Sequence, residues 1–504
     1  MAKPNQRTEF GDFQTPQPLA DAVCRLLRRR GTKPASVVEP TCGQGSLLLS
    51  ALEQFDTLDA AVGLDVNPDH LASVQQQLAS RADGRKVRLV HADFFATDWA
   101  AMLADLPEPL LVIGNPPWVT NAQLGSLGSK NLPVKSNFQK HAGLDALTGK
   151  SNFDISEWML IRLMESLDGR RGTLAMLCKT AVARKLLLHA WKHDFPLGAA
   201  AIYGMDAELH FGASVEACLL VCEFRPGCRQ QTAGVYETLD ARNSVSELGW
   251  RVGRVVANVE ALDRWSHLVR GEPDEDYVWR SGVKHDCAAA MELRLADGRW
   301  RNKLGESVDI EPAYVFPMLK SSAVAAGRTE HPASGMIVTQ FAVNAPTDVI
   351  RVTAPKTWAY LLAHAQLLDG RRSSIYRNRP RFSVFGVGEY TFAPYKVAIS
   401  GFYKRLSFEV VGSYQDKPVV FDDTVNFLAC RSKREAELLA GLLNSEPAAE
   451  FLSAFVFWDS KRPITVDVLR RLDLQQLAGH FGRTGELEQF GFRKQRRAAQ
   501  KSLF

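Results

Sequence analysis

The chain has 504 residues, of which 46% are hydrophobic and 23% are charged. This length and composition exclude a disulfide-stapled miniprotein and wholesale disorder, and predict at least two globular domains. The net charge of +5 is too small to indicate a polyanionic partner by itself. Because the N-terminus lacks the apolar core of a signal peptide and no apolar stretch is long enough to span a bilayer, we expect a soluble, cytoplasmic protein without membrane association.

The eight cysteines include no CxxC pair, so we expect reduced thiols in the core rather than a disulfide framework. Cys218, Cys222 and Cys228 are close enough in sequence to suggest a metal site, but a fourth ligand is not apparent. The run CLLVC is typical of a buried strand, whose alternation places both thiols on one face. We therefore predict no bound metal.

Short apolar runs alternate with helical patterns from residue 36 to about residue 224. This alternation predicts an α/β fold with a mainly parallel sheet, helices on both faces, and ligands at the carboxyl ends of the strands. The polar segment 225–234 ends the alternation, and the residues beyond it mix aromatic strand patterns with isolated helices. We predict a first domain over 1–230, an α+β domain over 235–480 and a basic tail over 481–504.

A loop with two glycines follows the first predicted strand and leads into a helix. Glycine lets the backbone turn tightly and approach a ligand, and the N-terminus of a helix offers unpaired N–H groups. A dinucleotide-binding loop would need a third glycine where this chain has Leu48, so no pyrophosphate cradle is predicted. The loop comprises Glu39, Pro40, Thr41, Cys42, Gly43, Gln44 and Gly45.

The next two predicted strands each end in an acidic residue. Asp65 follows the second strand, where a carboxylate can accept hydrogen bonds from both hydroxyls of a ribose. Asp93 and Phe94 follow the third strand, where they could pair with an adenine and stack on it. A turn glycine or a capping aspartate explains any one of these features alone, but their order at three consecutive strand ends favours a nucleoside-containing cofactor.

This order resembles the S-adenosylmethionine-binding half of a class I methyltransferase, which has a Rossmann-like sheet. The resemblance implies S-adenosylmethionine as the cofactor, with residues 39–45 near its methionine, Asp65 at its ribose and Asp93 at its adenine. The sequence FQTP at 13–16 resembles the segment of that family that closes over the cofactor, which adds Thr15 to the expected site. Thr-Pro is also an ordinary helix start.

The fourth predicted strand ends in the sequence Asn115-Pro116-Pro117-Trp118. Two consecutive prolines fix the backbone and remove two N–H donors, which leaves the carbonyls and the Asn115 amide as rigid acceptors. If the Asn115 and Pro116 oxygens accept both N–H groups of an aromatic amine, its nitrogen becomes pyramidal and can face a sulfonium methyl group. Trp118 would supply a stacking face for the base. A proline turn beside a core tryptophan is the alternative.

With this tetrapeptide, the chain resembles the N6-adenine DNA methyltransferases of restriction–modification systems, in which the cofactor motifs come first and the recognition domain last. The resemblance implies site-specific transfer of a methyl group to an adenine that is flipped out of duplex DNA. It makes 1–230 the catalytic domain and 235–480 the target recognition domain. Phe211 matches the aromatic residue that packs on the flipped base opposite Trp118, although a core phenylalanine is the alternative.

Basic residues predict where DNA would bind. The polar segment 119–150 contains Lys130, Lys135, Lys140 and Lys150, and we expect it to become ordered on DNA. Five arginines occur within the eleven residues 371–381, where they could contact phosphates or guanine, although a solvated basic loop is the alternative. The expected contacts in the second domain are Lys320, Arg371, Arg372, Tyr376, Arg377, Arg379, Arg381, Lys461 and Arg462.

Two alternative functions use the same motifs. A combined methyltransferase and restriction endonuclease would need a PD motif followed by E-x-K, but nothing suitable follows Pro273-Asp274. Methylation of adenine N6 in RNA, or of a protein glutamine, would also fit the tetrapeptide. The second domain and its arginine cluster favour a nucleic acid over a protein, but do not separate DNA from RNA. We expect double-stranded DNA as the partner, and a separate cognate endonuclease as a second one. The segments 284–286 and 422–423 fit buried ion pairs or helix caps equally well.

Overall fold

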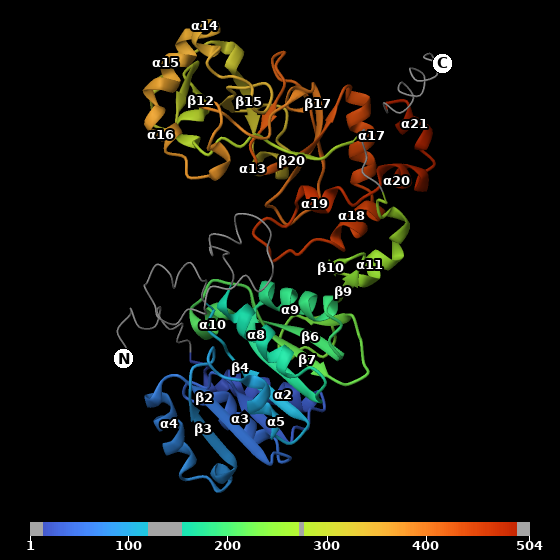
Figure 1. Cartoon of the computed structure of the whole chain (residues 1–504). Helices are drawn as coiled ribbons and strands as arrows, with labels where there is room; N and C mark the ends of the chain where they lie inside the picture. Colours follow the sequence, from blue (N-terminus) through green and yellow to red (C-terminus); the bar gives the residue numbers. More distant parts are fainter. Residues whose placement is uncertain (1–13, 119–153, 272–276, 491–504) are drawn as a thin grey trace. The chain divides into compact units, whose positions relative to one another are not determined.

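The computed structural model describes residues 14–118, 154–271 and 277–490, and the chain divides into two compact units, Met1–Val259 and Glu260–Phe504 (Figure 1). This division comes later in the sequence than the predicted one at 230–235. The reason is that strand β8 (Thr232–Tyr236) pairs in parallel with β6 (Leu197–Met205), so the backbone beyond residue 230 extends the first sheet.

Ten strands of the described residues form the sheet of the first unit, in the order β10-β9-β8-β6-β7-β5-β4-β1-β2-β3. The five strands β1 to β5 run parallel, whereas β7 is antiparallel to both of its neighbours. This arrangement confirms the predicted α/β fold with a Rossmann-like sheet. The other strands are β1 (Ser36–Glu39), β2 (Ala60–Asp65), β3 (Val87–His91), β4 (Leu110–Gly114), β5 (Gly172–Lys179), β7 (Ala217–Phe224), β9 (Ser246–Arg251) and β10 (Arg254–Val256).

The central strands β1 and β4 are buried along their whole length, and accordingly neither alternates polar with apolar residues: β4 is apolar throughout, and β1 has two valines between Ser36 and Glu39. Helices cover both faces of the sheet. One face packs against α2 (Gln17–Arg29), α3 (Ser46–Gln54), α4 (Pro68–Leu78) and α10 (Ala207–Phe211). The other packs against α5 (Trp99–Ala104), α8 (Ile155–Ser166) and α9 (Thr180–Lys192).

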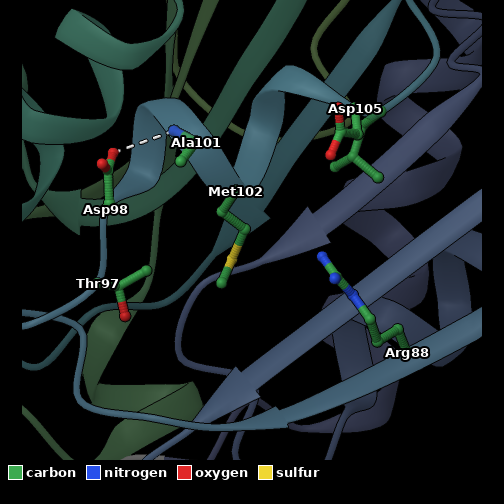
Figure 2. Close-up of a pocket in the computed structure, with 7 residues that line it drawn as sticks. Arg88, Thr97, Asp98, Ala101, Met102 and Asp105 are labelled. Carbon is green, nitrogen blue, oxygen red and sulfur yellow. Dashed lines mark hydrogen bonds between the residues drawn. The ribbon is translucent and has the colours of Figure 1, made fainter.

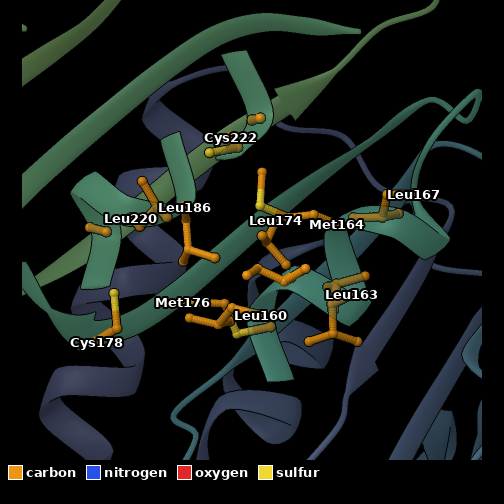
Figure 3. Close-up of a cluster of buried hydrophobic side chains, with 14 of the residues drawn as sticks. Leu160, Leu163, Met164, Leu167, Leu174, Met176, Cys178, Leu186, Leu220 and Cys222 are labelled. Carbon is orange, nitrogen blue, oxygen red and sulfur yellow. The ribbon is translucent and has the colours of Figure 1, made fainter. Parts of the chain in front are cut away.

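The core between β5, β7, α8 and α9 is shown in Figure 3, where leucine and methionine side chains interdigitate with the thiols of Cys178 and Cys222. All eight cysteines are free, and Cys218 and Cys222 are buried on β7, as expected for core thiols. In the described part of the chain, no group of three His, Cys, Asp or Glu side chains could hold a metal ion. None of the helices described there combines the length and apolar character that would cross a membrane.

The second unit contains two sheets, which confirms the predicted α+β domain. One sheet has the order β14-β13-β12-β16-β15-β19, and the other has the order β11-β20-β17-β18. The first comprises β12 (Glu292–Ala296), β13 (Arg299–Asn302), β14 (Ser307–Val308), β15 (Val315–Leu319), β16 (Ser334–Ile337) and β19 (Val420–Phe421). The second comprises β11 (Arg280–Ser281), β17 (Tyr395–Ser400), β18 (Glu409–Val411) and β20 (Val425–Cys430).

Short helices surround these sheets and complete separate hydrophobic cores. They are α11 (Val259–Arg264), α12 (Ala288–Met291), α13 (Ser321–Ala325), α14 (Ile350–Thr353), α15 (Pro355–Ala363), α16 (Ala365–Asp369), α17 (Lys433–Leu443), α18 (Glu446–Ser453), α19 (Val466–Leu469), α20 (Leu474–His480) and α21 (Thr484–Glu488).

Candidate active site

Three segments far apart in the sequence meet at the carboxyl ends of β1 and β4. Gln14 Oε1 accepts the backbone N–H of Gln44 in the glycine loop at 2.9 Å. The next residue, Thr15, accepts a hydrogen bond from Asn115 Nδ2 through its Oγ1 at 3.3 Å. The segment before α2 is therefore bonded both to the predicted cofactor loop and to the predicted catalytic tetrapeptide.

The loop between β1 and α3 has a conformation that requires its two glycines. Gly43 and Gly45 have φ angles of +48° and +79°, in the left-handed region. A Cβ at Gly43 would collide with the Gln14 side chain, and one at Gly45 would lie 2.9 Å from Val74 Cγ2. Thr41 Oγ1 is buried in the same loop and has no hydrogen-bond partner among the described residues. A tight backbone with an unpaired buried hydroxyl fits a polar ligand.

Two carboxylates flank this loop. Asp65, at the end of β2, is 9% exposed, and its oxygens accept the N–H groups of Gly43 at 2.7 Å and Asn67 at 2.8 Å. Glu39, at the end of β1, accepts the Leu48 N–H at 2.9 Å. Burial raises the pKa of the Glu39 carboxyl well above its ordinary value, although the Leu48 hydrogen bond opposes this. Asp65 thus lies against the glycine loop, as the strand order predicted.

The two residues predicted after β3 lie in different surroundings. Asp93 is exposed, and its Oδ1 accepts the N–H of Phe95 at 2.9 Å. Phe94 is buried in the core, with its ring 4.7 Å from that of Trp99. The structure therefore keeps Asp93 at the surface beside the strand end but packs Phe94 inside the protein.

The tetrapeptide follows β4 directly. Asn115 and Pro117 are half-buried, whereas Pro116 and Trp118 are buried. The Trp118 indole Nε1 donates to the carbonyl of Leu177 at 3.3 Å, and its ring lies edge-on to Phe211, with the ring centres 5.1 Å apart. Phe211, the last residue of α10, thus lies next to Trp118. Because the two rings touch, a base could stack between them only after they separate.

One residue that no motif singled out also contacts the tetrapeptide, and it pairs with a second such residue. Lys179, the last residue of β5, donates to the carbonyl of Trp118 and pairs with Asp154. Both lie where a strand or helix begins or ends, but neither carries a recognisable sequence signal.

A pocket of about 350 Å³ lies apart from these residues, between β3 and α5 (Figure 2). Arg88 comes from β3, and Asp98 caps α5 by accepting the N–H of Ala101 at 3.0 Å. None of the predicted site residues lines it. Its lining comprises Arg88, Thr97, Asp98, Ala101, Met102, Asp105 and Leu106.

In the second unit, three of the five arginines in the predicted cluster serve internal contacts. Arg371 donates to the carbonyls of His285 and Ser383, at 3.1 Å and 2.7 Å, and its guanidinium lies 3.7 Å from the centre of the Tyr376 ring. The Tyr376 hydroxyl in turn donates to the carbonyl of Lys284 at 3.2 Å. Arg371 and Tyr376 therefore hold two segments of this unit together.

Of the other four arginines of the cluster, two are also paired within the protein and two are not. Arg379 donates to Asn344 Oδ1 at 2.5 Å, and Arg381 pairs with Asp369 at 2.7 Å. Arg372 and Arg377 are exposed, and their guanidinium groups have no hydrogen-bond or ion-pair partner among the described residues. Only these two members of the cluster have guanidinium groups that remain unpaired there.

Lys320 lies in a buried ion-pair network. Its Nζ is 2.6 Å from Glu292 Oε2, which Lys303 also approaches to 2.7 Å, while His285 lies 3.5 Å from the other oxygen. Burial alone would raise the pKa of Glu292, but the hydrogen bonds from His285, Lys303 and Lys320 outweigh it and lower the pKa to about 2. Lys320 therefore compensates a buried carboxylate.

The segments 284–286 and 422–423 also supply ion pairs. Lys284 pairs with Asp286 at 3.6 Å, and Asp422 lies 3.9 Å from the Lys320 ammonium. Asp423 pairs with Arg462 at 3.5 Å, whereas Lys461 is exposed. Lys130, Lys135, Lys140 and Lys150, and the residues of the basic tail after 490, lie outside the described residues.

Two further arginines, which the sequence analysis did not select, share a face of the sheet. Arg294 on β12 is directly opposite Arg301 on β13, and both are exposed. Like charges directly opposite one another destabilise a strand pair unless a counter-charge is present. The signal was available in the sequence, since the Asp297-Gly298 turn predicts a hairpin that aligns these two positions.

Comparison with known proteins shows similarity to DNA methyltransferases. The family model N-6 DNA Methylase matches residues 2–184. The protein Type II methyltransferase M.NspV of Nostoc sp. (strain ATCC 29411 / PCC 7524) is 43% identical over 472 residues, which cover 94% of this chain and 98% of that protein. The structure of the Type IIL restriction-modification enzyme MmeI in complex with DNA matches in fold, with a TM-score of 0.54 and 12% identity, over 93% of this chain and 69% of the other.

Proposed function

The chain belongs to the type II methyltransferases, and from this premise we propose how its residues carry out site-specific methylation of adenine N6 in DNA. The observation that carries the proposal is that the segment Gln14–Thr15 is bonded both to Asn115 and to the glycine loop at neighbouring strand ends. It brings an amide acceptor, a ribose-type carboxylate and a tight ligand-binding loop to one edge of one sheet.

S-adenosylmethionine, the cofactor of this family, supplies an electrophilic methyl group on a sulfonium. The residues fit this cofactor, because the loop has no room for side chains at Gly43 and Gly45 and contains the unpaired hydroxyl of Thr41. The Asp65 carboxylate, held by two backbone N–H groups, would accept the hydroxyls of the ribose. Asp93, at the next strand end, would accept the amine of the cofactor's adenine.

Asn115 and Pro116 hold the target amine. Because Asn115 Nδ2 donates to Thr15, its amide has a fixed orientation, and Oδ1 can accept one N–H of the adenine amine. The Pro116 carbonyl accepts the other. These two acceptors would hold the N6 lone pair in line with the methyl group that bound S-adenosylmethionine would supply, and the proton that N6 loses on methylation would go to solvent.

The target adenine leaves the helix to reach this site, because its amine is inaccessible within a base pair. Trp118 supplies the stacking face, and Phe211 moves away from its edge contact with Trp118 to cover the other face of the base. Stacking on aromatic rings offsets part of the cost of unpairing, at about 1–3 kcal/mol per base.

The DNA phosphates are contacted by the basic side chains that have no internal role. In the second unit these include Arg372, Arg377 and Lys461, and we add the opposed pair Arg294 and Arg301, of which Arg301 also donates to the carbonyl of Gly305 at 3.5 Å. A phosphate between the two opposed guanidinium groups would supply the counter-charge that the sheet lacks.

A separate cognate endonuclease cuts unmodified sites. The enzyme acts in the cytoplasm, where its DNA substrate lies.

Incubation of plasmid DNA with the chain and S-adenosylmethionine, followed by single-molecule sequencing, tests this function. We expect N6-methyladenine within one short sequence motif. Methylation of cytosine, or modification of RNA but not of DNA, would contradict the proposal.

A further inference from the structure

Lys179 ties the tetrapeptide to the end of a neighbouring strand. Its ammonium lies 3.0 Å from the Trp118 carbonyl and 2.6 Å from Asp154 Oδ2. The side chains of Lys179 and Asp154 are 23% and 8% exposed, so water screens this ion pair only weakly. A lysine in such a position connects the residue after Pro117 to the first turn of α8.

The strand β5 holds Trp118 at two points. Leu177 accepts the indole N–H at 3.3 Å through its carbonyl, and Lys179, two residues later, donates to the Trp118 carbonyl. The end of β5 is itself fixed, because Lys179 pairs with Ala217 of the antiparallel strand β7. Both the ring and the backbone of Trp118 are therefore set by one rigid strand end.

Asp154 orients the lysine and offsets its charge. The Asp154 Oδ1 atom accepts the N–H of Ser156 at 3.1 Å and its hydroxyl at 2.6 Å, which caps α8 and leaves Oδ2 for Lys179. The target amine becomes positively charged while it takes up the methyl group, so an unpaired ammonium nearby would oppose the reaction. A paired ammonium positions the backbone without a net charge.

We propose that Lys179 is a positioning residue for methyl transfer. Through the Trp118 carbonyl it fixes the chain that carries the Asn115 and Pro116 oxygens, so that they meet the target amine in line with the methyl group. The inference rests on the proposed function of that tetrapeptide. It assigns to a lysine on β5 a role that neither the cofactor loop nor the tetrapeptide motif includes.

The test compares lysine variants of the full chain by single-turnover methylation of a duplex containing the target site. Lys179→Met should lower the rate on the order of 10²-fold, the cost of a misplacement of about 1 Å, with the KM for S-adenosylmethionine unchanged within about twofold. Lys179→Arg, which keeps a donor, should recover most of the rate. Because Lys179→Met leaves Asp154 unpaired, the double variant Lys179→Met/Asp154→Asn is made as well, and it should be equally slow.

Lys185→Met is the matched control. Lys185 lies on α9, the helix that directly follows Lys179, and pairs with the buried Glu157 of α8 at 2.6 Å. It has no hydrogen bond or ion pair with Trp118 among the described residues, and so it tests the loss of a lysine–carboxylate pair alone. It should keep the wild-type rate within about twofold. A wild-type rate in the folded double variant, or equal losses in the Lys179 and Lys185 variants, would overturn the inference. Failure of the proposed function gives a different result, because the wild-type protein itself would then place no methyl group on adenine N6.

Discussion

The two units differ in how the residues predicted from sequence are used. In the first unit, Asn115 bonds to Thr15, the neighbouring Gln14 bonds to the glycine loop, and Gly43 of that loop bonds to Asp65. In the second unit, Arg371 and several other predicted DNA contacts are engaged within the protein. Because the carboxyl ends of parallel strands lie at one edge of a sheet, the order of the strands predicts which side chains lie close together. A run of basic residues, in contrast, does not predict which guanidinium groups remain unpaired and can bind DNA.

The largest effect is expected for Asn115→Ala. Loss of one oriented acceptor at the reacting amine should lower kcat on the order of 10²–10³-fold, the scale seen when one preorganised polar group is removed from an active site. The Kd for S-adenosylmethionine, measured by calorimetry, should stay within about twofold of wild type. An unchanged kcat would remove Asn115 from the mechanism.

Asp65→Ala should weaken cofactor binding. Hydrogen bonds to a charged group contribute about 1.5–3 kcal/mol, which corresponds to a tenfold to hundredfold rise in the Kd for S-adenosylmethionine. Calorimetry measures this rise directly. Asp105→Ala, at the pocket between β3 and α5, is the control and should leave the Kd unchanged. A raised Kd in Asp105→Ala together with an unchanged Kd in Asp65→Ala would instead place the cofactor in that pocket.

The second unit should lose stability in acid through Glu292. Its pKa is about 2 in the fold, against an ordinary value of 4.5. The ionised carboxylate therefore contributes its full stabilisation above about pH 4.5, and this contribution is lost as the pH falls toward 2. The difference in Tm between wild type and Glu292→Gln should shrink over that interval. A constant difference would contradict the assignment of Lys320 to this internal network.

The smallest and most selective effects separate Arg377 from Arg371. Arg377→Gln should lower the slope of log K for DNA against log salt by about 0.9, the value of one phosphate contact, with no change in Tm. Arg371→Gln should lower Tm, because the carbonyls of Leu368, His285 and Ser383 lose this donor, while the slope stays the same. Fluorescence anisotropy at several salt concentrations measures both slopes. Equal slopes in the two variants would erase the distinction between the paired and the unpaired arginines.

The sequence predicted the fold class and the strand-end residues because apolar alternation and the Asn-Pro-Pro-Trp motif are local features. It did not distinguish Phe94 from its neighbour Phe95, since only the packed core decides which ring lies inside. The ion pair of Lys179 with Asp154 joins residues that lie 25 positions apart. Such pairs depend on how strand ends and helix starts meet, and no local pattern encodes them.

The first domain was predicted to end near residue 230, but the sheet continues to Val256. The added strands are short, and after β8, which is parallel to β6, they follow one another as antiparallel neighbours without helices between them. Edge strands without intervening helices resemble the patterns of an α+β domain, which is why composition alone placed the boundary too early in the chain.

A structure of the chain with its target duplex and a non-reactive S-adenosylmethionine analogue tests the central claim most directly. We expect the target adenine outside the helix, with its N6 at about 2.7–3.2 Å from both Asn115 Oδ1 and the Pro116 carbonyl oxygen. An adenine amine bonded to other residues, with those two oxygens occupied by the protein's own backbone, would contradict it.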